Sequence, residues 1–269
     1  MRPFKKLPGA LFRALGHYPT RLRGAALRVD PNHWRFWRKA ARGLWEPETL
    51  ECLAQRLEPQ MIVCDIGAWI GPTAIFAARH CSHVYCFEPD TTAYGELLRN
   101  LQLNRIDNVT PFNLALAATN GMRTAASFGG ARGDSQTSLL AASDGAHGAH
   151  RAHRAHDPSA MQVMTLSWAR WLELARPPRI DFLKIDIEGG EFDLLPSMAA
   201  DLAARRPTLL LSTHAPYLAP AEREPMMHRL ADALRVYGRC LNERQAPVGV
   251  DALLEPAALN RFRTFLFTD

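Results

Sequence analysis

The sequence lacks the features that would place the protein in a membrane or in an oxidising compartment. None of its apolar runs approaches the ~20 residues that a helix needs to cross a bilayer. Its five cysteines are scattered, without the CxxC spacing typical of metal sites. Arginines at positions 13, 21 and 23 interrupt any hydrophobic signal segment near the N-terminus. These absences predict a cytoplasmic protein with free cysteines.

Acidic side chains are scarce at the N-terminus. Residues 1–43 contain eleven lysines and arginines but one acid, Asp30, and apolar residues such as Phe12 and Trp34 are interleaved with the cations. We interpret residues 1–44 as a basic extension that packs on a catalytic domain spanning 45–269. The alternative is a contact surface for an anionic membrane or a phosphorylated substrate. Nucleic acid is not expected as a partner, because no DNA- or RNA-binding motif accompanies the charge.

Apolar runs alternate with amphipathic segments along the catalytic domain. We predict strands at 61–66, 83–87, 109–114, 162–165, 180–187, 208–212 and 262–267, and helices at 93–103, 192–202 and 222–234. This alternation is typical of an α/β fold in which a doubly wound, mostly parallel sheet carries helices on both faces. Pro111 is unusual inside a strand, because proline cannot donate to the hydrogen-bond ladder. Asn120-Gly121 predicts a hairpin turn into a returning strand at 124–128.

The stretch at 61–71 has the sequence of a nucleotide-binding strand and turn. Its apolar run ends at Asp65 and is followed by Gly67 and Gly71, which let the backbone pass close to a ligand. A helix begins at Pro72, so the unit reads strand, glycine turn, helix. Glu88 ends the next strand roughly 20 residues later, the spacing at which an acid meets a ribose hydroxyl. Together these residues predict a site for an adenosyl cofactor.

Two further strand ends carry polar side chains. Asp186 and Glu188 follow one predicted strand, and His214 follows the next. In an open α/β sheet the carboxyl ends of the strands form the ligand crevice, so these groups are expected to converge with Asp65 and Glu88.

Residues 129–159 interrupt the pattern. Glycine and serine are frequent there, and histidine recurs at every third position from His147 to His156. No cysteine or acid alternates with these histidines, so we interpret the segment as a mobile low-complexity loop. A metal-binding or pH-sensing role is the alternative.

Three motifs resemble those of the FkbM family of S-adenosylmethionine-dependent methyltransferases. They lie at 65–68 (DIGA), 87–89 (FEP) and 182–191 (FLKIDIEGGE), and the resemblance covers roughly residues 45–215. It implies a class I methyltransferase fold, with a Rossmann-like sheet of seven strands that includes one antiparallel strand near the C-terminus. It also implies S-adenosylmethionine as the cofactor.

The resemblance implies a cofactor role for each matching position. Gly67 and Gly71 would approach the methionine part of the cofactor. Asp65 would hold the turn or contact the cofactor's amino group, and Glu88 would accept hydrogen bonds from both ribose hydroxyls. The adenine is expected at the end of the third strand, near Asn113 or Ala115, and Asp186 and Glu188 would face the reacting centre.

The family chemistry is usually O-methylation, with a saccharide, glycolipid or secondary metabolite as acceptor. A base would accept the proton of the attacking hydroxyl, and His214 is the first candidate because its pKa is ordinarily near neutral. Asp186 and Glu188 are alternative bases, or they would hold other hydroxyls of the substrate. The sequence leaves open whether this acidic pair also holds a divalent metal.

Some positions depart from the family pattern. Trp69 stands where asparagine is usual, Gly190 where alanine is common, and Ser167-Trp168 where an acidic pair often follows the strand. A nicotinamide-dependent oxidoreductase is one alternative, but its GxGxxG fingerprint needs glycine at the position of Trp69. The other alternative is a non-catalytic protein that binds the cofactor.

Overall fold

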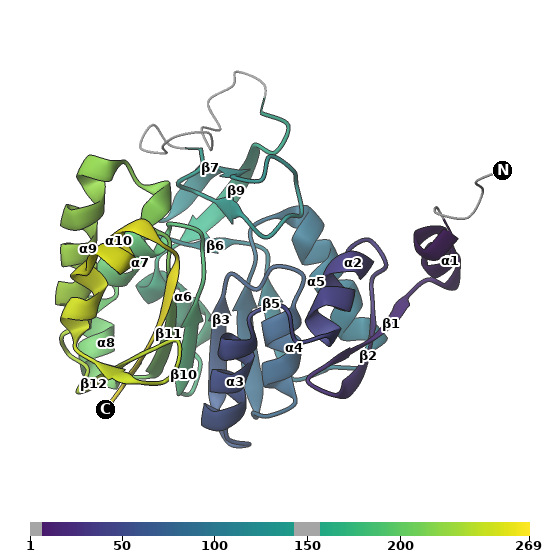
Figure 1. The fold of residues 1–269 in the computed structure, drawn as a ribbon, viewed down its shortest axis with the longest axis horizontal. Helices are drawn as coiled ribbons and strands as arrows, with labels where there is room; N and C mark the ends of the chain where they lie inside the picture. The colour runs from purple at the N-terminus through teal and green to yellow at the C-terminus, as the bar shows by residue number, and fades with distance from the viewer. Residues whose placement is uncertain (1–6, 143–156) are drawn as a thin grey trace.

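The structure, a computed structural model, describes residues 7–142 and 157–269. In these residues the main sheet has eight strands, in the order β13-β12-β14-β11-β10-β3-β4-β5 (Figure 1). The strands are β3 (Ile62–Ile66), β4 (His83–Phe87), β5 (Val109–Phe112), β10 (Phe182–Ile185), β11 (Thr208–Thr213), β12 (Arg239–Asn242), β13 (Pro247–Val248) and β14 (Arg263–Thr268). Strands β3, β4, β5, β10 and β11 run parallel, and β14 pairs antiparallel with both β11 and β12. The sheet thus has the seven strands that the resemblance implies, and the two-residue β13 adds an eighth at the edge. The strand predicted at 162–165 lies outside this sheet, and β12 was not predicted.

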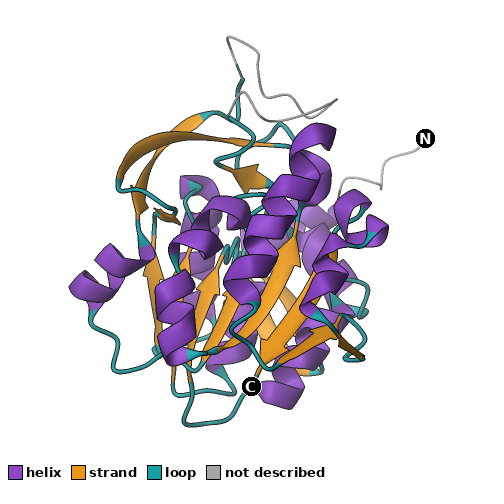
Figure 2. Cartoon of the chain, turned by 90° about the vertical axis from the view of Figure 1, so that its left-hand side faces the viewer, coloured by secondary structure: helices purple, strands orange, loops and turns teal. Residues whose placement is uncertain are grey.

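Helices cover both faces of this sheet (Figure 2). They are α3 (Pro47–Arg56), α4 (Pro72–Ala78), α5 (Thr91–Leu103), α6 (Trp168–Ala175), α7 (Glu191–Ser197), α8 (Ala199–Arg205), α9 (Pro220–Leu234) and α10 (Pro256–Asn260), with short 3-10 turns η2 (Ala215–Tyr217) and η3 (Val250–Leu254). Successive strand residues point to opposite faces. Val63 and Phe182 accordingly belong to one buried core, with α3, α4 and α5, while Cys64 and Leu183 belong to the other, with α6 to α9.

Two prolines have local effects on these elements. Pro111 lies in β5, which pairs only with β4 at the edge of the sheet, so its missing N–H costs no ladder bond. Pro196 lies inside the helix predicted for 192–202, which is divided into α7 and α8 around Met198.

The N-terminal segment packs on the domain through a small hairpin. Strands β1 (Tyr18–Leu22) and β2 (Ala25–Val29) pair antiparallel, between the helices α1 (Leu7–Leu15) and α2 (Trp34–Ala41). Leu22, Leu27 and Trp37 are buried in the same core as α5. The division of the chain at residue 44 stays a prediction.

A second sheet lies above the carboxyl ends of the main strands (Figure 1). It contains β6 (Ala115–Leu116), β9 (Met161–Leu166), β7 (Gly121–Ser127) and β8 (Thr137–Ser138), in that order. The predicted hairpin at Asn120-Gly121 is wrong, because β7 pairs antiparallel with β9 and not with the strand before it. The hydroxyl of Thr165 in β9 donates a hydrogen bond to the carbonyl of Thr119, which ties β9 to the turn that precedes β7.

In the segment predicted as a loop, the described residues 129–142 and 157–159 form turns and bends around the two-residue strand β8 (Thr137–Ser138), and its description as a mobile low-complexity loop stays a prediction. The run from His147 to His156 lies outside the described residues. Among the helices of the described chain, none combines the length and the apolar character required to cross a membrane.

Candidate active site

The glycine turn after β3 is held by polar groups of the protein itself. Asp65 is buried, and one of its carboxylate oxygens accepts a 2.5 Å hydrogen bond from the Thr73 hydroxyl while the other lies 3.1 Å from Lys184 Nζ. Gly67 has φ +87°, and a Cβ there would overlap the carbonyl oxygen of Asp186. At Gly71, with φ +93°, a Cβ would come within 2.5 Å of the Leu97 side chain of α5. Both glycines are thus required by contacts within the protein.

Lys184 joins the first motif to the third. Its ammonium group lies 3.1 Å from Asp65 Oδ1 and 3.9 Å from Asp186 Oδ2, and it donates to the Gly67 carbonyl at 3.3 Å. Burial by itself lowers the pKa of this amine, but the carboxylates of Asp65 and Asp186 outweigh it and raise the pKa above its usual range. The sequence analysis gave Lys184 no role. Its position in a buried strand, two residues before Asp186, was nevertheless a signal that it pairs with a carboxylate.

Glu88 lies on the wall of a small cavity of about 50 Å³. Its Oε1 accepts a hydrogen bond from Asp90 N at 2.7 Å and its Oε2 accepts one from Trp69 N at 2.9 Å. Burial raises the pKa of this carboxyl to about 8. Ala115 is on the same wall, with apolar neighbours on either side of it. Asn113 is instead exposed and donates to the backbone carbonyl of Glu88, so of the two adenine candidates Ala115 faces the cavity.

A segment at 128–140 closes over this cavity, which the sequence did not predict. Trp69 Nε1 donates to the carbonyl of Gly133 at 2.8 Å, and Gly133 N donates to Asp90 Oδ2 at 2.7 Å. Further along, the hydroxyl of Ser138 donates to the carbonyl of Glu188 at 2.7 Å. The segment is therefore tied to the ends of both β4 and β10.

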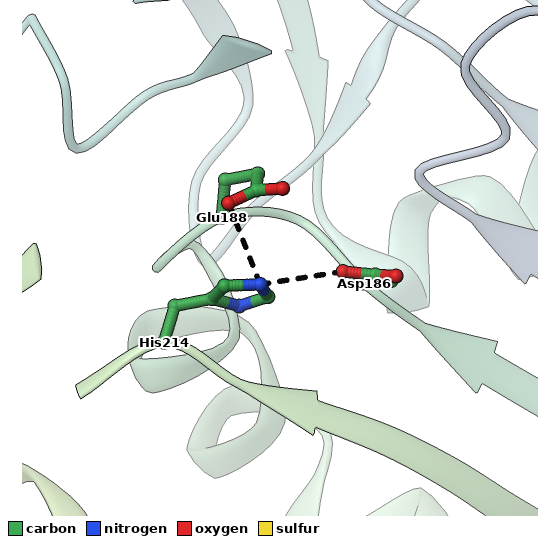
Figure 3. A group of neighbouring side chains, drawn as sticks. All are labelled: Asp186, Glu188 and His214. Atoms are coloured by element: carbon green, nitrogen blue, oxygen red, sulfur yellow. Dashed lines mark ion pairs between the residues drawn. The ribbon is translucent and has the colours of Figure 1, made fainter. Parts of the chain in front are cut away.

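Asp186, Glu188 and His214 converge as expected (Figure 3). His214 Nε2 lies 3.4 Å from Asp186 Oδ1 and 3.4 Å from Glu188 Oε2. All three line a second, larger cavity of about 310 Å³, whose other walls include Trp45, Glu46, Tyr217 and Phe262. The two cavities are adjacent, since both are lined by Gly67, Trp69, Ser135, Asp186 and Glu188.

Glu191 fixes the orientation of the His214 imidazole through its Nδ1 atom. Its side chain is fully buried, and Oε1 accepts a 2.7 Å hydrogen bond from His214 N and lies 3.2 Å from His214 Nδ1. Its Oε2 accepts from Gly189 N at 2.9 Å. With Nδ1 turned to Glu191, the other ring nitrogen of His214 faces Asp186 and Glu188. Glu191 was not among the site residues predicted from the sequence.

The excess of carboxylates perturbs the titration of this cluster. Burial lowers the pKa of His214, but Glu191 and Glu188 outweigh it and raise the pKa to about 10. The pKa of Glu188 is raised to about 8, chiefly by burial, and that of Glu46 to about 7 by burial and by Asp186. At neutral pH His214 is therefore a cation that neutralises part of the surrounding negative charge.

The sequence matches the model of the methyltransferase FkbM domain over residues 65–239. The chain belongs to this family. It is therefore an S-adenosylmethionine-dependent methyltransferase with the class I fold, and the oxidoreductase alternative is rejected. No curated protein matches the chain.

Several solved structures are similar to this FkbM methyltransferase. One is a methyltransferase FkbM from Methylobacillus flagellatus KT, with 13% identity, a TM-score of 0.45, and coverage of 85% of this chain and 60% of that one. Another is Trm5b from Pyrococcus abyssi, with 11% identity, a TM-score of 0.43, and coverage of 94% and 55%. The chain thus spans less than two thirds of the length of either protein.

The FkbM domain also has a group of side chains that could hold a metal ion. One ligand atom each of Asp186, Glu188 and His214 lies within 4.8 Å of the others. The same three groups already form ion pairs, with His214 supplying the positive charge. We therefore interpret the group as an ion-pair cluster, since carboxylates commonly lie this close without a metal.

Proposed function

We propose that this FkbM methyltransferase methylates a hydroxyl oxygen of a saccharide or glycolipid, or of a hydroxylated secondary metabolite. The observation that carries the proposal is the position of Asp186, Glu188 and His214 on the wall of the larger cavity, beside the cavity of Glu88. Carboxylates bind sugar hydroxyls, and the aromatic rings of Trp45 and Tyr217 offer apolar surface for the rest of a sugar ring.

The residues that line the smaller cavity offer suitable contacts for the adenosyl part of S-adenosylmethionine. Each Glu88 oxygen accepts one backbone hydrogen bond and keeps a lone pair for a ribose hydroxyl. Ala115 and its apolar neighbours Leu114 and Leu116 supply the surface on which an adenine packs. When bound, S-adenosylmethionine supplies an electrophilic methyl group on a sulfonium.

The chain's own residues would position the acceptor and take its proton. Orientation of two reactants in adjacent cavities is itself a large source of rate enhancement. We place the proton of the acceptor hydroxyl on the pair His214 and Glu188, whose facing atoms are 3.4 Å apart. The imidazolium cannot accept this proton, so the pair acts as a base only in the molecules in which it has already lost a proton, and that fraction grows as the pH rises.

The test is product analysis with S-adenosylmethionine and a panel of hydroxylated saccharides, glycolipids and secondary metabolites. We expect a methyl ether, identified by mass spectrometry and by NMR, and a much lower rate for His214→Ala than for the exposed control His228→Ala. A product methylated on nitrogen or carbon would overturn the proposal. Calorimetric binding of the cofactor without transfer to any acceptor would favour the non-catalytic alternative.

A further inference from the structure

Helix α1 lies at the outer edge of the molecule (Figure 1), and two of its leucines are exposed. Leu11 and Leu15 are each 56% exposed. They lie four residues apart, so they occupy the same side of the helix. Another side of α1 is anchored, because the ring of Phe12 lies 4.6 Å from that of Tyr18 and 6.1 Å from that of Trp34. The leucines therefore remain open while the helix is held in place.

Cations of α2 lie against the tryptophan on which α1 is anchored. The guanidinium groups of Arg35 and Arg38 lie 5.2 and 5.1 Å from the centre of the Trp34 ring, the ring that Phe12 also contacts. We define the α1–α2 face as Leu11, Leu15, Trp34, Arg35 and Arg38.

The positive charge of the α1–α2 face comes from Arg35 and Arg38. Within residues 7–142 and 157–269, no carboxylate forms an ion pair with either arginine. Asp30, the one acid among residues 1–43, is already paired with Arg99 at 3.0 Å. The face thus needs a partner that is both anionic and able to cover exposed leucines.

We propose that the α1–α2 face binds the surface of an anionic lipid bilayer. Leucines can insert between acyl chains, a tryptophan ring suits the headgroup level, and arginines pair with lipid phosphates. An RNA would satisfy the arginines but would leave the leucines in water. The face is also connected to the active site, since the Phe36 ring of α2 lies 4.5 Å from the ring of Trp69, which lines both cavities.

The test is co-sedimentation of the full chain with vesicles of phosphatidylcholine alone or mixed equally with phosphatidylglycerol. We expect binding to the anionic vesicles that weakens as salt is added. Each cation near such a surface contributes about fivefold in affinity, so Arg35→Gln with Arg38→Gln should weaken binding about 25-fold. Leu11→Ser with Leu15→Ser should also weaken it. The matched control is Arg239→Gln with Arg244→Gln, two exposed cations near the opposite edge of the sheet.

Several outcomes would overturn the proposal. One is equal binding to neutral and anionic vesicles, and another is an equal loss in the control variant. Unchanged affinity of the leucine variant together with displacement by RNA would indicate a nucleic-acid surface instead. Calorimetry with S-adenosylmethionine accompanies each variant, because intact cofactor binding shows that the protein is folded and separates this proposal from the proposed methyl transfer.

Discussion

Replacing Glu191 with glutamine should lower the pKa of His214 by several units. The substitution keeps the shape of the side chain and removes a buried negative charge that lies 3.2 Å from His214 Nδ1. At an effective dielectric constant of about 20, a charge pair separated by 3 to 5 Å interacts by about 3–5 kcal/mol. Since one pKa unit corresponds to ~1.4 kcal/mol, the pKa of His214 should fall by about 2–4 units from its raised position.

The raised pKa of His214 determines the direction in which the free energy of unfolding changes with pH. The pKa of His214 in the folded protein, about 10, is above the ordinary value of 6.5. Its stabilising contribution is therefore fully present below pH ~6.5 and is lost as the pH rises toward 10. In Glu191→Gln that loss should be smaller and should end at a lower pH. We would measure the free energy of unfolding in urea from pH 6 to 10, and titrate the His214 ring protons by NMR.

The control for this substitution is Asp193→Asn, which removes an exposed carboxylate from the same helix. It should leave the NMR titration of His214 unchanged. Glu191→Gln should also destabilise the protein by about 1–3 kcal/mol at neutral pH, because the amide cannot accept from both Gly189 N and His214 N. An unshifted His214 pKa in Glu191→Gln would refute the reasoning, whatever the change in stability.

Three other substitutions test separate parts of the site. Glu88→Gln should weaken S-adenosylmethionine binding about tenfold by calorimetry, because the amide nitrogen that replaces one carboxyl oxygen cannot accept a hydrogen bond from a ribose hydroxyl; unchanged affinity would remove that role. His214→Ala should lower turnover at least a hundredfold with less than a threefold change in cofactor affinity, and an unaltered rate would place the base elsewhere. Gly67→Ala should lower the free energy of unfolding in urea by more than about 3 kcal/mol, because its Cβ overlaps the Asp186 carbonyl and φ is +87°. The control is Gly24→Ala at an exposed position, where φ is +84° but no atom lies within 4 Å of the new Cβ, and it should lower the free energy of unfolding less.

The central strands could be predicted because they are buried on both faces. Every residue of β3 and β10 is buried, and each strand is an apolar run with a single charged residue, Asp65 or Lys184. The hairpin of β1 and β2 was missed for the opposite reason. β1 contains Pro19 and Arg21 and alternates with exposed positions, so its sequence resembles a solvated extension. Strand β12 was missed as well, because it has only four residues and begins with the exposed Arg239.

Convergence of the site could be predicted from topology, but its detailed contacts could not. Asp186 and His214 follow neighbouring parallel strands, so their meeting follows from the order of the sheet. The bond of Glu191 to His214 depends on how α7 packs against the end of β11. The position of the segment 128–140 depends on Trp69, a residue that departs from the family pattern. The indole of Trp69 donates a hydrogen bond to the Gly133 carbonyl in that segment. No local pattern in the sequence records such long-range contacts.

The first and third motifs are better understood as one structural unit than as two ligand-binding signatures. β3 and β10 are neighbours in register, with Ile66 opposite Ile185, and Asp186 N donates to the carbonyl of Ile66 at 3.0 Å. The next residue, Gly67, must lack a side chain because the Asp186 carbonyl occupies that space. Lys184 completes the unit by lying between Asp65 and Asp186. A glycine that suggested close approach to a cofactor is thus first required by the strand that carries the acidic pair. For this reason the two motifs depend on each other across more than a hundred intervening residues.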